Sequence, residues 1–149
     1  MIRNEQEYRA ALQRIEADRA FAAQQRAALE ELGLSAEEVE RGMQPTVSFH
    51  AQLVEEVAWY ERVKSGDVET IRRLTAIGRL LIALRIAMGF TQQELAERLG
   101  IDQSQVSRDE RNEYHGITFE RAQRILDALG VGVYLGAQLP EGRRTARPA

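Results

Sequence analysis

Cysteine is absent from this chain of 149 residues, only three prolines are present, and aromatic residues make up 6%. Without cysteine there is no disulfide framework, no thiolate nucleophile and no cysteine-ligated metal. The two histidines lie far apart in the sequence, so we expect no metal site. No nucleophile lies at a recognisable spacing from a base, and no glycine-rich phosphate loop is present. We therefore expect a protein that is not an enzyme, with no catalytic residues and no cofactor.

Long apolar runs are also missing. The most apolar stretch, residues 77–88, contains Arg79 and Arg85 and is too short to span a bilayer. The N-terminal sequence MIRNEQEYR is charged from its third residue and has no apolar run behind it, unlike a secretory signal. We expect a cytoplasmic protein without a membrane partner.

The two halves of the chain differ in charge. The formal net charge is −3, but residues 1–66 carry 8 Lys+Arg against 12 Asp+Glu, whereas residues 67–149 carry 12 against 11. Arginine supplies 19 of the 20 basic residues. Arginine suits bidentate recognition of phosphates or bases, although a GC-rich genome would produce the same bias. The second half could present a local basic face, although its mean charge does not show one, and the acidic residues of 1–66 are most simply a solvated face.

The first part of the chain has the pattern of a helical hairpin. Residues 4–32 contain no proline or glycine, and apolar residues recur there every seven positions, at Tyr8, Ile15, Ala22 and Leu29. Gly33 ends this helix. Ser35 and Glu38 form a capping-box pattern that opens a short helical turn through Met43. We expect Pro45 to start the next helix, which runs to Lys64, and we assign residues 1–66 to a hairpin for dimerisation or partner binding.

The second part, residues 67–139, shows helical signals separated by glycines. Asp67 is the expected cap of a helix that continues to Met88, and two short capped helices and a longer one follow it. After Gly130 the apolar residues Val131, Val133 and Leu135 alternate with others, as in a short strand or an extended arm. The polar, basic residues 140–149 are expected to form a flexible tail. The predicted fold is all-α.

The segment TQQELAERLGIDQSQVSRDE, residues 91–110, carries the most specific signal. It contains two short helices joined by Gly100, and glycine permits the positive φ that a tight reversal needs. Ala96 leaves room for the second helix to cross closely, and apolar residues lock the pair. We expect Asp102 to cap the second helix, with Gln105 in the reciprocal position, and the helix to span about residues 102–114. This is the pattern of a helix-turn-helix unit.

Residues 76–135 resemble the Xre family of bacterial and phage repressors, which have a Cro/C1-type helix-turn-helix domain. The residues that carry the resemblance are Arg85, Met88-Gly89-Phe90, Thr91-Gln92-x-Glu94-Leu95-Ala96-x-x-Leu99-Gly100-Ile101, Gln103-x-x-Val106-Ser107-Arg108-x-Glu110 and Leu126-x-x-Leu129-Gly130-Val131. The resemblance implies a five-helix, lambda-repressor-like domain. It also implies that the helix at 102–114 enters the major groove of DNA.

The resemblance assigns roles to individual residues. Base edges would be read by Gln103, Ser104 and Arg108, with Ser107 as a further candidate. Glutamine pairs well with adenine, arginine with guanine, and serine with either. Contacts to phosphates and positioning of the domain would come from Gln92, Thr91, Asn112 and His115. Gln92 would also brace the recognition helix.

Two further positions complete this comparison. Arg85 and Glu110 resemble the internal ion pair of the family, which joins the first helix of the domain to the recognition helix. Asp109 departs from the family pattern, because the family usually has an apolar residue there. We expect Asp109 either to face DNA or to neutralise Arg108 or Arg111 in the free protein.

These features predict a sequence-specific DNA-binding transcriptional regulator, a repressor that binds an operator as a homodimer. The dimer contact would come from residues 131–135, from the hairpin, or from both. An alternative follows from the opening Ile2-Arg3-Asn4-Glu5-x-x-Tyr8-x-x-Ala11-Leu12, which resembles the start of some HigA-type antitoxins. In that case the acidic hairpin would hold a basic toxin, and the helix-turn-helix domain would regulate the operon.

Overall fold

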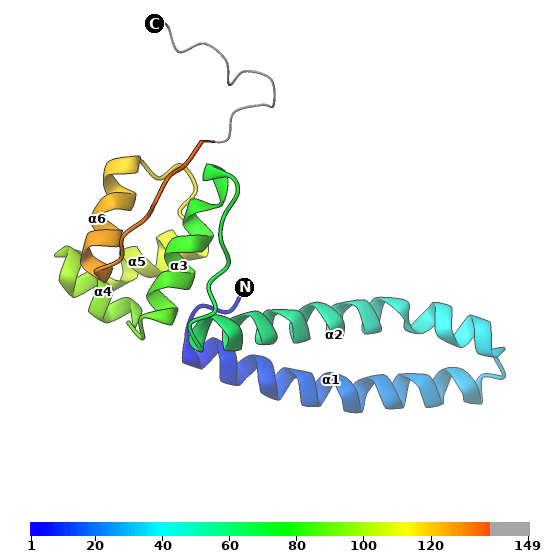
Figure 1. The fold of residues 1–149 in the computed structure, drawn as a ribbon. Helices are drawn as coiled ribbons and strands as arrows, with labels where there is room; N and C mark the ends of the chain where they lie inside the picture. Colours follow the sequence, from blue (N-terminus) through cyan, green and yellow to red (C-terminus); the bar gives the residue numbers. More distant parts are fainter. Residues whose placement is uncertain (138–149) are drawn as a thin grey trace, which may run out of the picture.

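The computed structural model describes residues 1–137, so the predicted tail at 140–149 and the last two residues of the predicted domain 67–139 lie outside the described residues. Over residues 1–137 the fold contains six α-helices, one 3-10 helix and no strand. A long hairpin projects from a compact group of four short helices (Figure 1). The predicted all-α class and the order of hairpin and helix-turn-helix domain are confirmed.

The hairpin consists of α1 (Glu5–Glu31) and α2 (Ala36–Lys64), which lie side by side in opposite directions (Figure 1). Asn4 caps α1 by accepting a hydrogen bond from the backbone N–H of Glu7 at 2.8 Å. The predicted capping box of α2 is present, with Ser35 and Glu38 bonded reciprocally. Local sequence signals therefore fix where both helices begin.

The predicted break at Pro45 is wrong, because α2 runs through Pro45 without interruption. Proline removes one backbone hydrogen bond from a helix interior, a cost that packing on both sides can outweigh. Val39 and Met43 are buried before Pro45, while Pro45 itself is exposed to solvent. The short turn predicted for residues 35–43 is therefore the first part of one long helix.

The predicted helix at 67–88 is also shorter than expected. Residues 67–73 are not helical, η1 (Leu74–Ala76) is a single 3-10 turn, and α3 begins only at Ile77 (Ile77–Ala87). Val68, Thr70 and Ile71 are β-branched, which favours an extended backbone. The connector also has to run alongside α3 to reach its beginning, as Figure 1 shows, and a helix of seven residues would be too short for that path.

Three more helices complete the domain: α4 (Gln92–Leu99), α5 (Gln103–Arg111) and α6 (Phe119–Leu129). Four α-helices preceded by η1 thus replace the predicted five-helix arrangement. The residues after Gly130 form an arm over 131–137 that is not part of a strand. Of the two possibilities left open by the sequence, the arm is the one observed.

One hydrophobic core spans the predicted domain boundary at residue 66. Ile15, Val57 and Tyr60 from the hairpin belong to the same buried cluster as Leu81 and Ile125 of the helix-turn-helix part. Ile2, which precedes α1, is also buried in this cluster. The base of the hairpin is therefore packed onto the four-helix part rather than tethered to it.

A membrane-spanning helix has to be about 20 residues long and predominantly apolar. Within the described residues no single helix is long and apolar enough to cross a bilayer. Residues Leu74–Ala87 and Gln92–Leu99 pass that test only as a pair bent by 107°.

Candidate nucleic-acid interface

The turn between α4 and α5 follows from local sequence. Thr91 and Glu94 form a capping box at the start of α4, in which Thr91 N–H donates to the Glu94 carboxylate at 2.7 Å. The hydrogen bonds from the backbone and side chain of Thr91 lower the pKa of Glu94. Gly100 ends α4 in the left-handed region with φ of 65°. This conformation reverses the chain and allows α5 to pack across α4.

The predicted capping of α5 by the Asp102 side chain is wrong. Asp102 occupies the position before the helix, but its side chain makes no capping hydrogen bond. Gln105 instead donates its backbone N–H to the backbone oxygen of Asp102 at 3.0 Å. The helix also ends at Arg111 rather than near residue 114, because Glu113 and Tyr114 adopt positive φ values of 47° and 52°.

A buried ion pair holds α5 against the rest of the domain. Arg85 on α3 donates from Nε and Nη2 to the two carboxylate oxygens of Glu110 on α5, at 2.5 and 2.7 Å. Both side chains are almost fully buried. Arg85 also donates from Nη1 to the backbone oxygen of Phe90 at 2.7 Å. This bidentate geometry fixes the angle of α5 relative to α3.

Gln92 belongs to the same buried network. Its Nε2 atom donates to Oε2 of Glu110 at 2.7 Å, and the residue is 8% exposed. The side-chain amide is therefore directed at α5, which matches the bracing part of its expected role. The backbone N–H groups of Gln92 and Gln93 belong to the first turn of α4 and have no partner within the helix. These backbone groups, rather than the amide, are the donors that α4 can offer to a phosphate.

The outer face of α5 carries the residues expected to read bases. Gln103, Ser104 and Arg108 are exposed, and Ser107 is half-buried. Val106 and Glu110 lie on the opposite, buried side of the same helix. Because α5 is short and its inner side is locked, the polar outer side projects as a fixed row.

Asp109 contacts neither of its expected partners, Arg108 and Arg111. It pairs instead with Arg121 of α6. The carboxylate therefore ties α5 to α6 inside the domain. Proximity in sequence suggested Arg108 and Arg111, whereas the fold brings a residue of the next helix closer.

Asn112 and His115 lie in the loop after α5, and both are exposed. Between them, Tyr114 is buried, and burial raises the pKa of its hydroxyl well above 10. A methyl group at Gly78 of α3 would lie 1.8 Å from the backbone oxygen of Glu113. Glycine at position 78 is thus what lets this loop lie directly on α3.

The contacts of two further arginines were not identified from the sequence. Arg98 on α4 lies over the ring of Phe90, 4.0 Å from its centroid, and donates to the backbone oxygen of Ala128 at 2.8 Å. Arg3 offers its backbone oxygen to Arg85 at 2.7 Å. Neither contact has a local sequence signal, since their partners lie 30 and 82 residues away.

A protein-family model matches part of this chain. Curated proteins and solved structures gave no significant similarity to this chain. Residues 81–134, just over a third of the chain, match a protein-family model described as Helix-turn-helix. The match begins in α3 and extends into the arm, so it includes the buried ion pair and the row of polar residues on α5. The C-terminal part of this chain is therefore similar to helix-turn-helix domains, over the residues whose sequence resembles the Cro/C1 type.

Proposed function

We propose that this protein is a transcriptional repressor that binds an operator sequence through α5. The observation that supports this most strongly is the exposed row of Gln103, Ser104 and Arg108 on a helix whose inner side is locked by Arg85, Gln92 and Glu110. Side chains of these three types hydrogen-bond to base edges in the major groove. A locked helix keeps their spacing fixed, which sequence-specific recognition requires.

The test is a fluorescence-anisotropy titration with duplex DNA from upstream of the gene for this protein. A scrambled duplex at about physiological salt is the control. We expect nanomolar binding to the native sequence and a preference of at least ~10³ over the scramble. Equal, weak binding to both duplexes would contradict a sequence-specific regulator.

The contribution of base reading can be measured with Arg108→Ala. Loss of an arginine contact to guanine is expected to cost about 1–3 kcal/mol against the preferred site and to relax base preference at one position. Arg124→Ala is the matched control, because Arg124 is exposed on α6 and its replacement removes the same charge. Gln92→Ala removes the amide that braces α5 through Glu110 and is expected to weaken binding to all sequences alike. If Arg108→Ala reduced specific and scrambled binding equally, Arg108 would not read a base.

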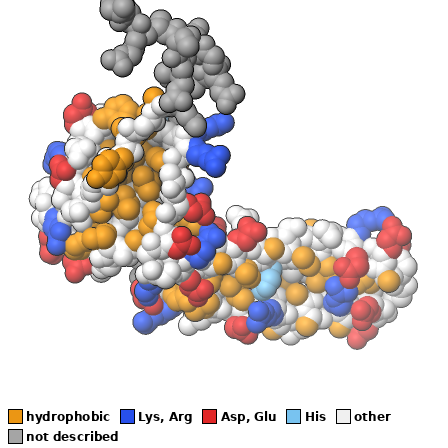
Figure 2. All heavy atoms as spheres, viewed as in Figure 1, with side chains coloured by type: hydrophobic (Ala, Val, Ile, Leu, Met, Phe, Trp, Pro, Cys, Tyr) orange, Lys and Arg blue, Asp and Glu red, His pale blue; other side chains and the backbone are white. Residues whose placement is uncertain are grey.

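The same proposal includes a homodimer that forms through the arm and the adjoining connector. The arm exposes Tyr134 completely and Leu135 by 76%, and Leu74 of η1 is half exposed. These segments border an apolar hollow of about 610 Å³ beside α3. Hydrophobic side chains gather on this face of the four-helix part (Figure 2). A second copy would cover them and place two recognition helices about 34–36 Å apart, as a two-fold operator requires.

Sedimentation measurements test the dimer. We expect the parent protein to sediment as a dimer and Tyr134→Asp to sediment as a monomer with weakened operator binding. Phe119→Asp is the control, because Phe119 is 69% exposed on α6 and does not border this hollow. A dimer that persists in Tyr134→Asp would place the contact elsewhere, in the hairpin first of all.

A second candidate function, an antitoxin that holds a toxin through residues 1–66, is favoured by the surface of the hairpin. Phe21 and Phe49 are 58% and 56% exposed on the projecting part, and Val47 is half exposed. Residues 16–44 carry seven acidic side chains against three arginines. Apolar residues set among negative charges suit a basic protein partner.

Co-expression with the product of the adjacent gene, followed by gel filtration, tests this function. Phe21→Arg should abolish the complex and leave DNA binding intact, and the absence of any complex would contradict it.

A further inference from the structure

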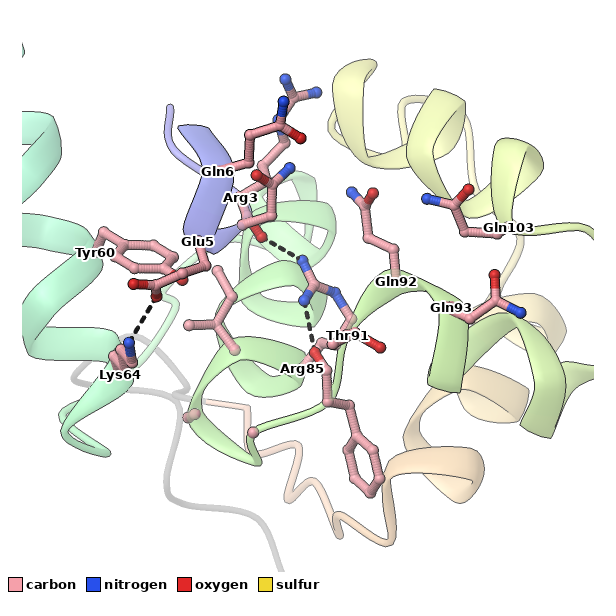
Figure 3. Close-up of a pocket in the computed structure, with 15 residues that line it drawn as sticks. Arg3, Glu5, Gln6, Tyr60, Lys64, Arg85, Thr91, Gln92, Gln93 and Gln103 are labelled. Carbon is pink, nitrogen blue, oxygen red and sulfur yellow. Dashed lines mark hydrogen bonds and ion pairs between the residues drawn. The ribbon is translucent and has the colours of Figure 1, made fainter. Parts of the chain in front are cut away.

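An open hollow of about 600 Å³ lies between the base of the hairpin and the helix-turn-helix part. Figure 3 shows its residues, with side chains from the first turn of α1 on one side and side chains of α4 and α5 on the other. Its polar lining comes from both parts: Arg3, Asn4, Glu5 and Gln6 from the hairpin, and Thr91, Gln92, Gln93 and Gln103 from the helix-turn-helix part. The segment that begins the hairpin therefore borders the surface proposed to face DNA.

The residues before α1 are held firmly in this place. Ile2 is buried in the common core, and the N-terminal amine of Met1 pairs with Glu56 at 2.9 Å. The backbone oxygen of Arg3 accepts a hydrogen bond from Nη2 of Arg85 at 2.7 Å. Because Arg85 also holds Glu110 of α5, one guanidinium fixes the start of the hairpin and the recognition helix to each other.

The acidic side chains in the first turn of α1, Glu5 and Glu7, are already paired. Glu5 accepts a hydrogen bond from Lys64 at 2.7 Å, which lowers the pKa of Glu5. Glu7 accepts from the side chain of Arg3 at 2.7 and 3.2 Å. The Arg3 side chain is 17% exposed, and because a guanidinium has five N–H groups, it keeps donors beyond the two directed at Glu7. Gln6 is exposed and adds an amide donor on the same turn.

We propose that the beginning of the hairpin, through Arg3 just before α1 and Gln6 in its first turn, contacts the DNA phosphate backbone beside the point where α4 and α5 dock. This inference rests on the proposed DNA-binding function and enlarges its interface. Arg3 and Gln6 supply cationic and amide donors, and phosphate oxygens accept from both types. The contact carries no base preference. It orients the projecting hairpin relative to the duplex and adds to affinity for every sequence.

Salt dependence separates a phosphate contact from a structural role. Each phosphate that a cationic side chain neutralises adds about 0.9 to the slope of log K against log salt. We expect Arg3→Gln to reduce that slope by about 0.9 between ~50 and ~200 mM salt, equally on upstream and scrambled duplexes. Arg19→Gln is the matched control, because it removes the same charge from the middle of α1, where Arg19 pairs only with Glu16. Its slope should equal that of the parent protein.

A second pair of variants tests Gln6. Gln6→Glu places a negative charge at the proposed phosphate contact and should weaken binding to both duplexes by about tenfold, as expected for one contact of ~1–2 kcal/mol. Gln24→Glu makes the same change on the same face of α1, since 18 residues are five full turns, about 27 Å further along. Gln24→Glu should bind DNA like the parent protein.

The outcomes distinguish this inference from the proposed function. If the parent protein binds DNA while Arg3→Gln keeps the parent slope and Gln6→Glu keeps the parent affinity, the hairpin does not contact DNA and only this inference fails. If the parent protein binds neither duplex, the proposed function and this inference fail together. Unchanged helical circular dichroism in Arg3→Gln is expected, because the backbone oxygen that Arg85 uses is retained.

Discussion

The hairpin and the helix-turn-helix part are stabilised in different ways. In the projecting stretch, residues 16–55, only Val39 and Met43 are buried. In the helix-turn-helix part, by contrast, Leu81, Ile82 and Leu95 are at most 1% exposed, and even a charged pair is enclosed. The projecting helices thus depend on local signals such as caps, whereas the compact part depends on contacts between residues far apart in sequence.

Ion pairs show the same contrast. Many of the hairpin's pairs join residues three or four positions apart on one helix, such as Arg19 with Glu16 and Arg41 with Glu37. Pairs of this kind are exposed and contribute little to stability. The pair of Arg85 with Glu110 joins residues that lie 25 positions apart, on two different helices, and is buried. Removing one partner of such a pair leaves a buried charge without compensation.

The largest expected effect follows from that pair. Arg85→Ala should lower the free energy of unfolding by about 3–5 kcal/mol, because Glu110 would remain buried without its partner. It would also remove the bonds to the backbone oxygens of Phe90 and Arg3. Urea unfolding followed by circular dichroism measures this change.

The control comes from the hairpin. Arg41→Ala removes one exposed pair and should leave the unfolding midpoint unchanged within error. Equal effects of Arg85→Ala and Arg41→Ala would show that burial does not distinguish the two regions.

A smaller change in stability is expected from replacing a helical glycine by alanine, once in each region. In Gly78→Ala the new methyl group would meet the backbone oxygen of Glu113 at 1.8 Å, and this loop already holds two residues at positive φ. The resulting shift should cost about 1–3 kcal/mol. In Gly42→Ala the methyl group would meet Cδ1 of Leu29 at 3.2 Å, at the end of a flexible side chain.

Alanine is favoured over glycine in a helix by about 1 kcal/mol. Gly42→Ala should therefore leave the stability of the protein equal or slightly higher, while Gly78→Ala lowers it. Thermal unfolding of both variants measures the difference. A loss of stability in Gly42→Ala as large as that in Gly78→Ala would mean that the hairpin is packed as tightly as the compact part.

The same division explains which features the sequence could predict. The capping boxes at Ser35 and Thr91, the reversal at Gly100 and the end of α6 at Gly130 are local signals, and each is present in the structure. Residues within one turn determine them. The resemblance at residues 76–135 then supplied the arrangement of these helices, which periodicity alone does not give.

The features that were missed depend on distant residues. Asp109 pairs with Arg121 rather than with its neighbours, and Gly78 matters only because Glu113 lies on it. The connector at 67–73 is extended because the end of α2 and the beginning of α3 lie apart. Its β-branched residues favour that backbone but do not show how far it has to reach. Pro45 was misjudged for a related reason, since buried residues in α2 outweigh its local cost.

Two tyrosines give the smallest expected difference between the regions. The pKa of Tyr8 in the hairpin is raised by its hydrogen bond to Glu61, whereas the pKa of Tyr114 is raised by burial, to a value well above its usual 10.0. Well below pH 10 both tyrosines are protonated in the folded and unfolded states, so neither makes stability depend on pH. Above pH 10 the unfolded chain loses these protons first, and stability falls as the pH rises.

Tyr114→Phe should therefore reduce the loss of stability between about pH 9 and pH 11, a range that includes the ordinary tyrosine pKa. Tyr8→Phe should reduce it less, because solvent reaches the Tyr8 hydroxyl and weakens the effect of its partner. The pKa of Tyr60 is also raised by burial, and Tyr60 is present in both variants, so its contribution is common to them. Urea midpoints measured across this pH range provide the comparison. If Tyr8→Phe flattened the profile more than Tyr114→Phe, a single exposed hydrogen bond rather than burial would control the alkaline stability of this protein.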